Sequence, residues 1–273
     1  MIKDSVLPCS AQRKALVSVV FRSAKAYGVA CFSGLALVGT VLDWNGHVIM
    51  RNSEVSNGVE ADSAARLCFR GGGGAARKVP MHQATDDLFR DVLPWRKFRW
   101  YYGQHHYSAS YWASTMSAHV IYESRLELAR LLTADFDTSV NHIVAQPFLI
   151  QAPVDGKRRR HIPDYLLLTD DGPVVVDVKP ADLLDDTAVA ETFEWVRAVV
   201  ESLGWSFEVA SEQPGVLMEN IRFLARYRRR AWVNDSALSQ LRTRPLDGTS
   251  VGEAIHATHG AEPLVRAALL HML

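Results

Sequence analysis

Two acidic residues lie in apolar segments, where a carboxylate is costly to bury. Asp177 is the one charged residue in the run 173–178, and Lys179 follows it by two positions. Because side chains alternate along a strand, Asp177 and Lys179 belong on the same face. Asp164 lies in the preceding apolar run, and a hairpin that turns at 170–172 would place it beside Asp177.

A pair of carboxylates in an apolar sheet needs a compensating charge. The two groups repel each other and lose hydration unless a cation lies between them. Mg²⁺ and Mn²⁺ suit this role because hard divalent ions prefer carboxylate oxygens and keep positions open for water. We expect Glu123 to complete the site from an upstream helix, and Lys179 to orient the attacking water or stabilise charge on a phosphate. Such a site is suited to phosphodiester hydrolysis.

Each of these residues also has a structural interpretation of its own. Asp164 after a proline is typical of a turn, Lys179 of a strand end, and Glu123 of a solvated helix face. Together, however, a helical glutamate, a Pro-Asp pair and Asp-x-Lys at strand spacing match the pattern of a PD-(D/E)xK nuclease core. The combination favours catalysis over three unrelated structural roles.

The elements around these residues predict an α/β fold. Hydrophobic periodicity indicates a helix, three strands, a longer helix and a fourth strand, in the order α-β-β-β-α-β. That order is typical of a mixed sheet flanked by helices. The expected helices span 120–132 and 186–203, and the expected strands span 142–151, 162–168, 173–178 and 205–210.

Five separated blocks of sequence make a more specific pattern, and they occur in the order expected of one family. Over roughly residues 96–215 the chain resembles the TnsA-like endonuclease subunit of heteromeric transposases, within the PD-(D/E)xK nuclease superfamily. The blocks are 101–107 (YYGQHHY), 119–127 (HVIYESRLE), 146–148 (QPF), 160–165 (RHIPDY) and 176–180 (VDVKP).

The resemblance implies a restriction-endonuclease-like core that cuts the 5′ strands of double-stranded DNA at transposon ends. It also implies a DDE-type transposase subunit for the 3′ strands, an AAA+ ATPase that regulates both, and Mg²⁺ or Mn²⁺ as cofactor. Carried over by position, Glu123, Asp164 and Asp177 would be metal ligands. The backbone carbonyl of Val178 would be a further ligand, and Lys179 the catalytic lysine. Asp177 replaces the Glu or Gln that related nucleases often carry, which shortens its reach by one methylene.

Basic residues cluster near this site and again further along the chain. The run 157–160 abuts the Pro-Asp pair, where a phosphate backbone could pass the metal. A second group of arginines recurs at helical spacing between 222 and 230, which suits a DNA-facing surface or a helix with its basic side in water. Aromatic residues crowd 95–112 and suit either base stacking or a lid over the core. The predicted DNA-binding residues are Lys157, Arg158, Arg159, Arg160, Arg226, Arg229 and Arg230.

Composition divides the chain into three predicted regions. Glycines at 71–74 indicate a flexible linker, so residues 1–75 are expected to form a poorly defined extension and 76–215 the endonuclease domain. Residues 216–273 are expected to be helical, with a capping box at 250–253 that opens the first of two short helices. That pair resembles a truncated or reduced winged-helix or helix-turn-helix module.

The overall composition sets only loose limits on function. Thirty basic residues balance thirty acidic ones, so only local clustering can indicate nucleic-acid binding. Three scattered cysteines argue against a disulfide framework and fit a reducing cytoplasm, with association to the bacterial nucleoid expected when the protein acts. The apolar run 26–42 is interrupted by glycines and shorter than the ~20 residues of a spanning helix, so no membrane role is expected.

Two other functions fit the same residues. The first is a stand-alone nuclease of restriction, repair or defence, which a neighbouring methyltransferase gene would favour and a neighbouring transposase gene would disfavour. The second is a non-catalytic DNA-binding or assembly protein that keeps the fold as a scaffold. The intact set of acidic residues, together with Lys179, argues for catalysis.

Overall fold

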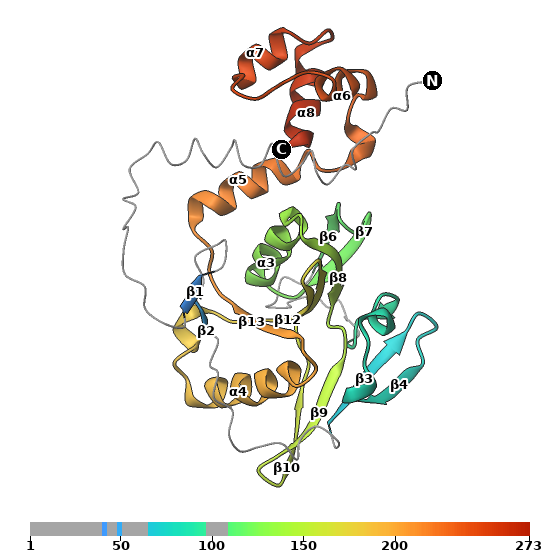
Figure 1. The fold of residues 1–273 in the computed structure, drawn as a ribbon, viewed down its shortest axis with the longest axis vertical. Helices are drawn as coiled ribbons and strands as arrows, with labels where there is room; N and C mark the ends of the chain where they lie inside the picture. Colours follow the sequence, from blue (N-terminus) through green and yellow to red (C-terminus); the bar gives the residue numbers. More distant parts are fainter. Residues whose placement is uncertain (1–39, 43–47, 51–64, 97–108) are drawn as a thin grey trace, which may run out of the picture.

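The computed structural model describes residues 40–42, 48–50, 65–96 and 109–273, whose fold is shown in Figure 1. The apolar run that ends at residue 42 lies almost wholly outside these ranges, and so does most of the aromatic stretch. The expectations for those two segments therefore stay predictions.

A four-stranded mixed sheet lies at the centre of the molecule, in the strand order β13-β12-β11-β8. Neighbouring strands are antiparallel except for β12 and β13, which run parallel because helix α4 (Thr187–Glu201) connects them as a crossover. The strands are β8 Val140–Ala145, β11 Tyr165–Thr169, β12 Gly172–Val178 and β13 Ser206–Ala210.

A second sheet branches from the first through the chain between β8 and β11. Its main strand order is β10-β9-β3-β4, with β5 paired to β3, and every neighbouring pair is antiparallel. The β9–β10 hairpin thus leaves the four-stranded sheet after β8 and returns to it at β11. The strands are β3 Arg66–Gly71, β4 Ala76–Pro80, β5 Val92–Leu93, β9 Leu149–Val154 and β10 Lys157–His161.

The described part of the chain also contains two short antiparallel pairs, five further α-helices and four short 3-10 helices. None of these helices is long and apolar enough to cross a membrane. The strand pairs are β1 Thr40–Leu42 with β2 Val48–Met50, and β6 Ala109–Ala113 with β7 Ala118–Tyr122. The helices besides α4 are α3 Arg125–Phe136, α5 Gly215–Ala225, α6 Asp235–Arg242, α7 Val251–His256 and α8 Glu262–Met272.

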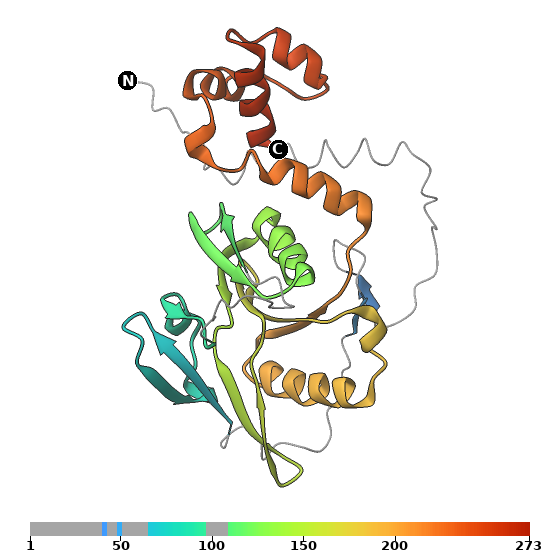
Figure 2. The ribbon, with the colours of Figure 1, turned by 180° about the vertical axis from the view of Figure 1, so that it is seen from behind.

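Both faces of the four-stranded sheet are covered, as Figure 2 shows, with α3 on one side and α4 on the other. Leu166, Leu168 and Val175 pack in a cluster with side chains from α4 and the second sheet. Leu167 and Val176 belong to a different cluster that includes side chains from α3. Burial on both faces explains why these strands are apolar at successive positions, so that a charged residue within them is conspicuous.

The structure corrects the expected element order, because five strands lie between α3 and α4 where three were expected. The expected strand 142–151 is two strands, β8 and β9, since Gln146 adopts a left-handed backbone (φ 46°) before Pro147 and turns the chain. The basic run 157–160 adds another strand, β10, after a tight turn in which Asp155 and Gly156 both have positive φ.

The expected helix 120–132 also begins later than the sequence pattern indicates. Val120 and Ile121 belong to strand β7, as suits β-branched residues. Helix α3 begins at Arg125 because the hydroxyl of Ser124 caps it, accepting a hydrogen bond from the Glu127 backbone at 3.0 Å. Glu123 therefore precedes the helix rather than lying on its surface.

The glycine run does not act as a linker between domains. It forms the turn of the β3–β4 hairpin, where Gly74 has a φ of +81° and its N–H donates to the carbonyl of Gly71. Leu67 and Phe69 of β3 are buried in the same core as α4. The boundary expected after residue 75 thus falls inside a hairpin, and β3 packs with residues of the region 76–215.

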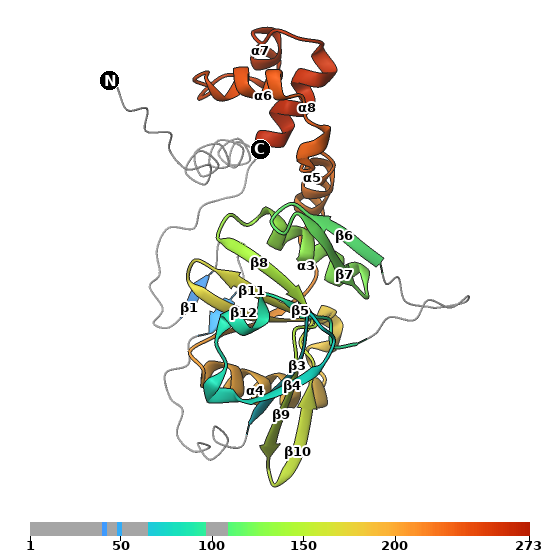
Figure 3. The same ribbon diagram turned by 90° about the vertical axis from the view of Figure 1, so that its right-hand side faces the viewer.

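The end of the chain is helical, as expected for residues 216–273. Helices α6, α7 and α8 enclose a small core of their own around Leu238, Leu241 and Val265. Figure 3 shows these three helices grouped beyond α5, away from both sheets. The predicted capping box is confirmed, with Ser250 and Glu253 bonded reciprocally at the start of α7.

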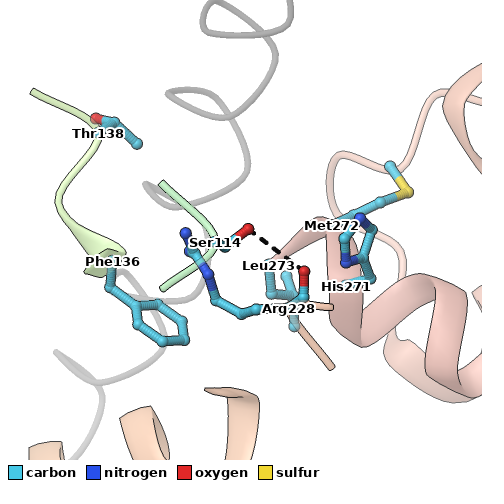
Figure 4. A pocket seen from close by; sticks show the side chains of 7 residues that line it. All are labelled: Ser114, Phe136, Thr138, Arg228, His271, Met272 and Leu273. Atoms are coloured by element: carbon cyan, nitrogen blue, oxygen red, sulfur yellow. Dashed lines mark hydrogen bonds between the residues drawn. The ribbon is translucent and has the colours of Figure 1, made fainter. Parts of the chain in front are cut away.

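A buried ion pair joins the segment after α5 to the sheet region. Asp135 in α3 is 1% exposed and accepts a hydrogen bond from the Tyr111 hydroxyl at 2.8 Å. The Arg228 guanidinium lies 3.4 Å from the Asp135 carboxylate and donates to its backbone carbonyl at 2.6 Å. Figure 4 shows Arg228 near Phe136 and Ser114, whose hydroxyl donates to the Arg228 carbonyl. These contacts hold the segment after α5 against α3.

We expect Asp135→Ala to lower the free energy of unfolding by about 3–5 kcal/mol, because it removes the acceptor shared by Arg228 and Tyr111 inside the protein. Urea unfolding followed by circular dichroism measures the change. Asp171→Ala removes an exposed carboxylate from the β11–β12 turn and should change stability by no more than about 0.5 kcal/mol. Equal losses in the two variants would contradict the assignment of this pair.

Candidate active site

The β11–β12 hairpin brings Asp164 and Asp177 together, as the sequence predicts. Asp164 lies just before β11, and its backbone N–H donates to the carbonyl of Val176 at 3.0 Å. Its carboxylate accepts a hydrogen bond from the backbone N–H of Val178 at 2.7 Å. Asp164 is therefore bonded to both neighbours of Asp177 on the opposite strand, so the two carboxyl groups belong to one small region of the sheet.

Asp177 has a partner from the second sheet. Its residue surface is 3% exposed, and its two carboxylate oxygens lie 2.7 and 2.9 Å from Nε2 of His161. The His161 ring meets the indole of Trp195 from α4 in an edge-to-face contact with centroids 6.1 Å apart. A buried carboxylate is thus paired with a ring that is itself fixed by packing.

Glu123 reaches the same region from the junction between β7 and α3. One carboxylate oxygen accepts a hydrogen bond from the side-chain amide of Gln146 at 2.7 Å, and the other lies 3.2 Å from the Arg96 guanidinium. The backbone N–H of Glu123 donates to the carboxylate of Glu127 at 2.7 Å. Both the main chain and the side chain of Glu123 are therefore held in place.

The carboxyl group of Asp164 has a raised pKa. Burial is the largest cause that raises this pKa to about 8, the charges of Asp177 and Glu127 add to the rise, and Glu123 contributes least. The N–H of Val178 opposes this rise because it stabilises the ionised form. Burial also raises the pKa of Glu127. Asp164 and Glu127 thus hold their protons more readily than ordinary carboxyl groups, because they are buried beside other acids.

Lys179 is placed by the parallel pair of strands at the end of β12. Its backbone N–H donates to the carbonyl of Ala210 at 2.9 Å, and its carbonyl accepts from the Ser211 hydroxyl at 2.8 Å. It follows Asp177 by two residues, and Val178 between them points to the opposite side of the strand. The backbone thus gives the Asp-x-Lys segment the alternation that the sequence predicts.

The carboxyl cluster suits a hard divalent cation by the chemistry of its oxygen donors. Within the described residues, no three His, Cys, Asp or Glu side chains are arranged to hold an ion together. Glu123 is bonded to Gln146 and Arg96, and Asp177 to His161. The expected convergence of three acids on one point is therefore not present, although the three acids do lie in one region.

The predicted DNA-binding residues fall into two groups with different surroundings. Lys157 to Arg160 lie along β10, with Arg158 and Arg160 exposed on the face opposite His161. Arg160 lines an open pocket together with Trp95, Arg96 and His161. This pocket adjoins the carboxyl cluster, because His161 and Arg96 in its lining contact Asp177 and Glu123.

The structure corrects the expected helical spacing of the second group of arginines, because α5 ends at Ala225, before Arg226, Arg229 and Arg230. Arg226 is exposed at the C-cap of that helix. The Arg229 guanidinium lies over the rings of Trp112 and Trp232, at 4.6 and 5.1 Å from their centroids. Arg230 is paired with Asp235. Arg229 and Arg230 thus already have partners within the protein.

Three residues of the site are not among those predicted from the sequence. Glu127 carries a sequence signal, since its spacing from Ser124 is that of a helix cap. His161 and Gln146 lie in two of the blocks that carry the family resemblance, 160–165 and 146–148, but the resemblance assigns them no role. Their contacts depend on how the two sheets diverge, which the sequence does not indicate.

In the metal-free protein, Asp164 should make the fold less stable as the pH rises. The pKa of its carboxyl is about 8 in the folded chain and 3.8 ordinarily, so between these values the unfolded chain has released a proton that the folded chain retains. Ionisation therefore favours unfolding progressively from about pH 4 to about pH 8. We expect Asp164→Asn to melt above wild type at pH 9 and to lose that advantage toward pH 4.

Thermal melts in the presence of a chelator test this expectation across the pH range. Asp185→Asn, which changes an exposed carboxylate before α4, serves as the matched control and should follow wild type throughout. A difference between Asp164→Asn and wild type that stays constant with pH would show that the raised pKa is wrong.

Comparison with known proteins identifies the region that contains most of this site. Residues 137–212 match the family model of the TnsA-like endonuclease N-terminal domain. The matched region runs from β8 to β13 and contains Asp164, Asp177 and Lys179, while Glu123 lies ahead of it. No curated protein matches the chain. The family match agrees with the resemblance carried by the sequence blocks, and residues 137–212 are therefore similar to the TnsA-like endonuclease N-terminal domain.

Proposed function

We propose that this protein is the metal-dependent DNA endonuclease subunit of a heteromeric transposase, and that it hydrolyses phosphodiester bonds in the 5′ strands at transposon ends. The proposal is carried by one observation. A region that matches the TnsA-like endonuclease model holds Asp164 beside Asp177, close to Glu123 and followed at strand spacing by Lys179. Acidic groups of this kind, grouped with a lysine at the ends of neighbouring strands, suit nucleic-acid hydrolysis.

In this proposal the acids hold Mg²⁺ or Mn²⁺. Glu123, Asp164 and Asp177 would supply carboxylate oxygens, and Val178 its backbone carbonyl. When bound, such an ion acts as a Lewis acid that stabilises charge on the phosphate and lowers the pKa of water. Gln146 and Arg96 hold Glu123, and His161 holds Asp177, so these acids would have to move closer together for one cation to contact all three.

Lys179 would act on the phosphate or on the attacking water. The strand pairing fixes its backbone beside Ala210, so its ammonium extends from a rigid part of the sheet. An ammonium group in that position stabilises the negative charge that develops as the phosphodiester bond is attacked. The exposed arginines of β10 would bind the DNA backbone beside the site.

The proposed partners follow from the family resemblance. A DDE-type transposase subunit would cut and join the 3′ strands, and an AAA+ ATPase would regulate the assembly. The test therefore uses the reconstituted complex and DNA that carries both transposon ends.

Lys179→Ala should reduce 5′-strand cleavage by at least about 100-fold, because it removes a group that stabilises the transition state. Strand-specific cleavage of end-labelled DNA in Mg²⁺ measures the loss. Asp164→Ala should reduce cleavage at least as much and should also abolish Mn²⁺ binding. Lys78→Ala, which changes an exposed lysine of β4, is the matched control. Undiminished cleavage by Lys179→Ala or Asp164→Ala would overturn the proposed site.

The double variant Arg158→Ala/Arg160→Ala should weaken DNA binding in a salt-dependent way. If each arginine contacts one phosphate, the slope of log K against log salt should become shallower by about 2, since each neutralised phosphate contributes roughly 0.9. Anisotropy titrations of a labelled duplex at several salt concentrations give that slope. Arg266→Ala, which removes a charge from α8 far from the sheets, should leave it unchanged. An unaltered slope in the double variant would place the DNA elsewhere.

A further inference from the structure

Gln146 has an unusual backbone for its position. It directly follows β8 and precedes Pro147, it is 4% exposed, and its φ is +46°. A side chain with a Cβ rarely adopts this left-handed conformation, because Cβ approaches the following carbonyl oxygen. Buried residues in such conformations persist only where the surrounding contacts impose them, and they concentrate at functional sites.

The contacts that impose this conformation all lead to the candidate site. The backbone N–H of Gln146 donates to the carbonyl of Asp164 at 2.8 Å, and its own carbonyl accepts from Trp95 at 3.0 Å. Its side-chain oxygen accepts from the backbone of Arg96 at 3.2 Å, and its side-chain nitrogen donates to the Glu123 carboxylate at 2.7 Å. The partners fix the orientation of the amide, since a backbone N–H only donates and a carboxylate only accepts.

These four bonds connect segments that are far apart in the sequence. Glu123 precedes the cap of α3, Asp164 precedes β11, and Arg96 follows β5. The Glu123 carboxylate has two described partners that set its direction, Gln146 and Arg96, and Arg96 is itself attached to the Gln146 side chain through its backbone. The orientation of Glu123 therefore depends on the amide of Gln146.

We propose that Gln146 is a positioning residue of the active site, which orients the Glu123 carboxylate through its side chain and fixes Asp164 through its backbone. This inference rests on the proposed function, because it assumes that Glu123 and Asp164 hold a divalent cation. Gln146 contacts neither the cation nor the DNA in this account. It acts through Glu123, in the way that outer hydrogen-bond partners tune metal ligands.

Gln146→Gly separates the side-chain role from the backbone role. Glycine accepts a positive φ without strain and keeps both backbone hydrogen bonds, while the amide is lost. We expect Gln146→Gly to weaken Mn²⁺ binding to the full chain by about tenfold or more, as measured by calorimetric titration. Thr169→Val removes hydrogen bonds at the far end of the β11–β12 hairpin and should bind Mn²⁺ as wild type does.

A double-mutant cycle with Glu123→Ala shows whether Gln146 acts through Glu123. If it does, Gln146→Gly should change Mn²⁺ affinity by less than about twofold once Glu123 is absent, whereas a merely structural effect would persist. Wild-type affinity in Gln146→Gly, or an equal effect in both backgrounds, would overturn the inference.

A metal-free measurement distinguishes failure of this inference from failure of the nuclease proposal. The side-chain amide signals of Gln146 in a ¹H–¹⁵N spectrum should move on Glu123→Ala, because the hydrogen bond to the carboxylate is lost. Signals that stay in place would refute the positioning role, whatever the metal does. Absence of Mn²⁺ binding by the wild-type chain would instead refute the nuclease proposal, and the moving amide signals would still support the link between Gln146 and Glu123.

Discussion

The crowding of carboxyl groups at the ends of two central strands of an apolar sheet is the constraint on which the rest of the site depends. Each ionised acid must have a donor or a cation nearby, because burial makes an isolated charge costly. Glu123 and Asp177 meet this requirement with side-chain partners. Asp164 receives only partial compensation from the Val178 backbone, and burial, together with the charges of Asp177 and Glu127, raises its pKa to about 8. In the proposed function, a divalent cation would favour the ionised form of this carboxyl group.

Much of the core could be predicted from the sequence because its patterns are local. The strand with Asp177, the hairpin that pairs it with Asp164, and the capping box of α7 each depend on residues close together in the chain. The division of 142–151 into two strands could not be predicted, because a polar residue before a proline does not by itself indicate the left-handed backbone of Gln146. The start of α3 was predicted too early, since Val120 and Ile121 continue an apolar periodicity that a hairpin and a helix share.

The functional partners of the acids were harder to predict than the acids themselves. His161 and Gln146 bind Asp177 and Glu123 across large separations in sequence, and a single sequence carries no record of such pairings.

At the Gly71–Gly74 turn, in contrast, a local pattern gave the wrong prediction. Its composition suggests a flexible linker, but the strands on either side of it are paired, and Leu67 next to it is buried. Composition indicates which conformations a segment can adopt, and tertiary packing determines which of them it adopts.

The β9–β10 hairpin leaves the central sheet at Gln146 and rejoins it at Asp164, so both crossings lie within the cluster of acids. His161 and Asp177 also join the two sheets at this level. The two sheets are therefore joined at the candidate active site. Because both sheets meet at these residues, a change in the angle between the sheets would also change the spacing of the carboxylates.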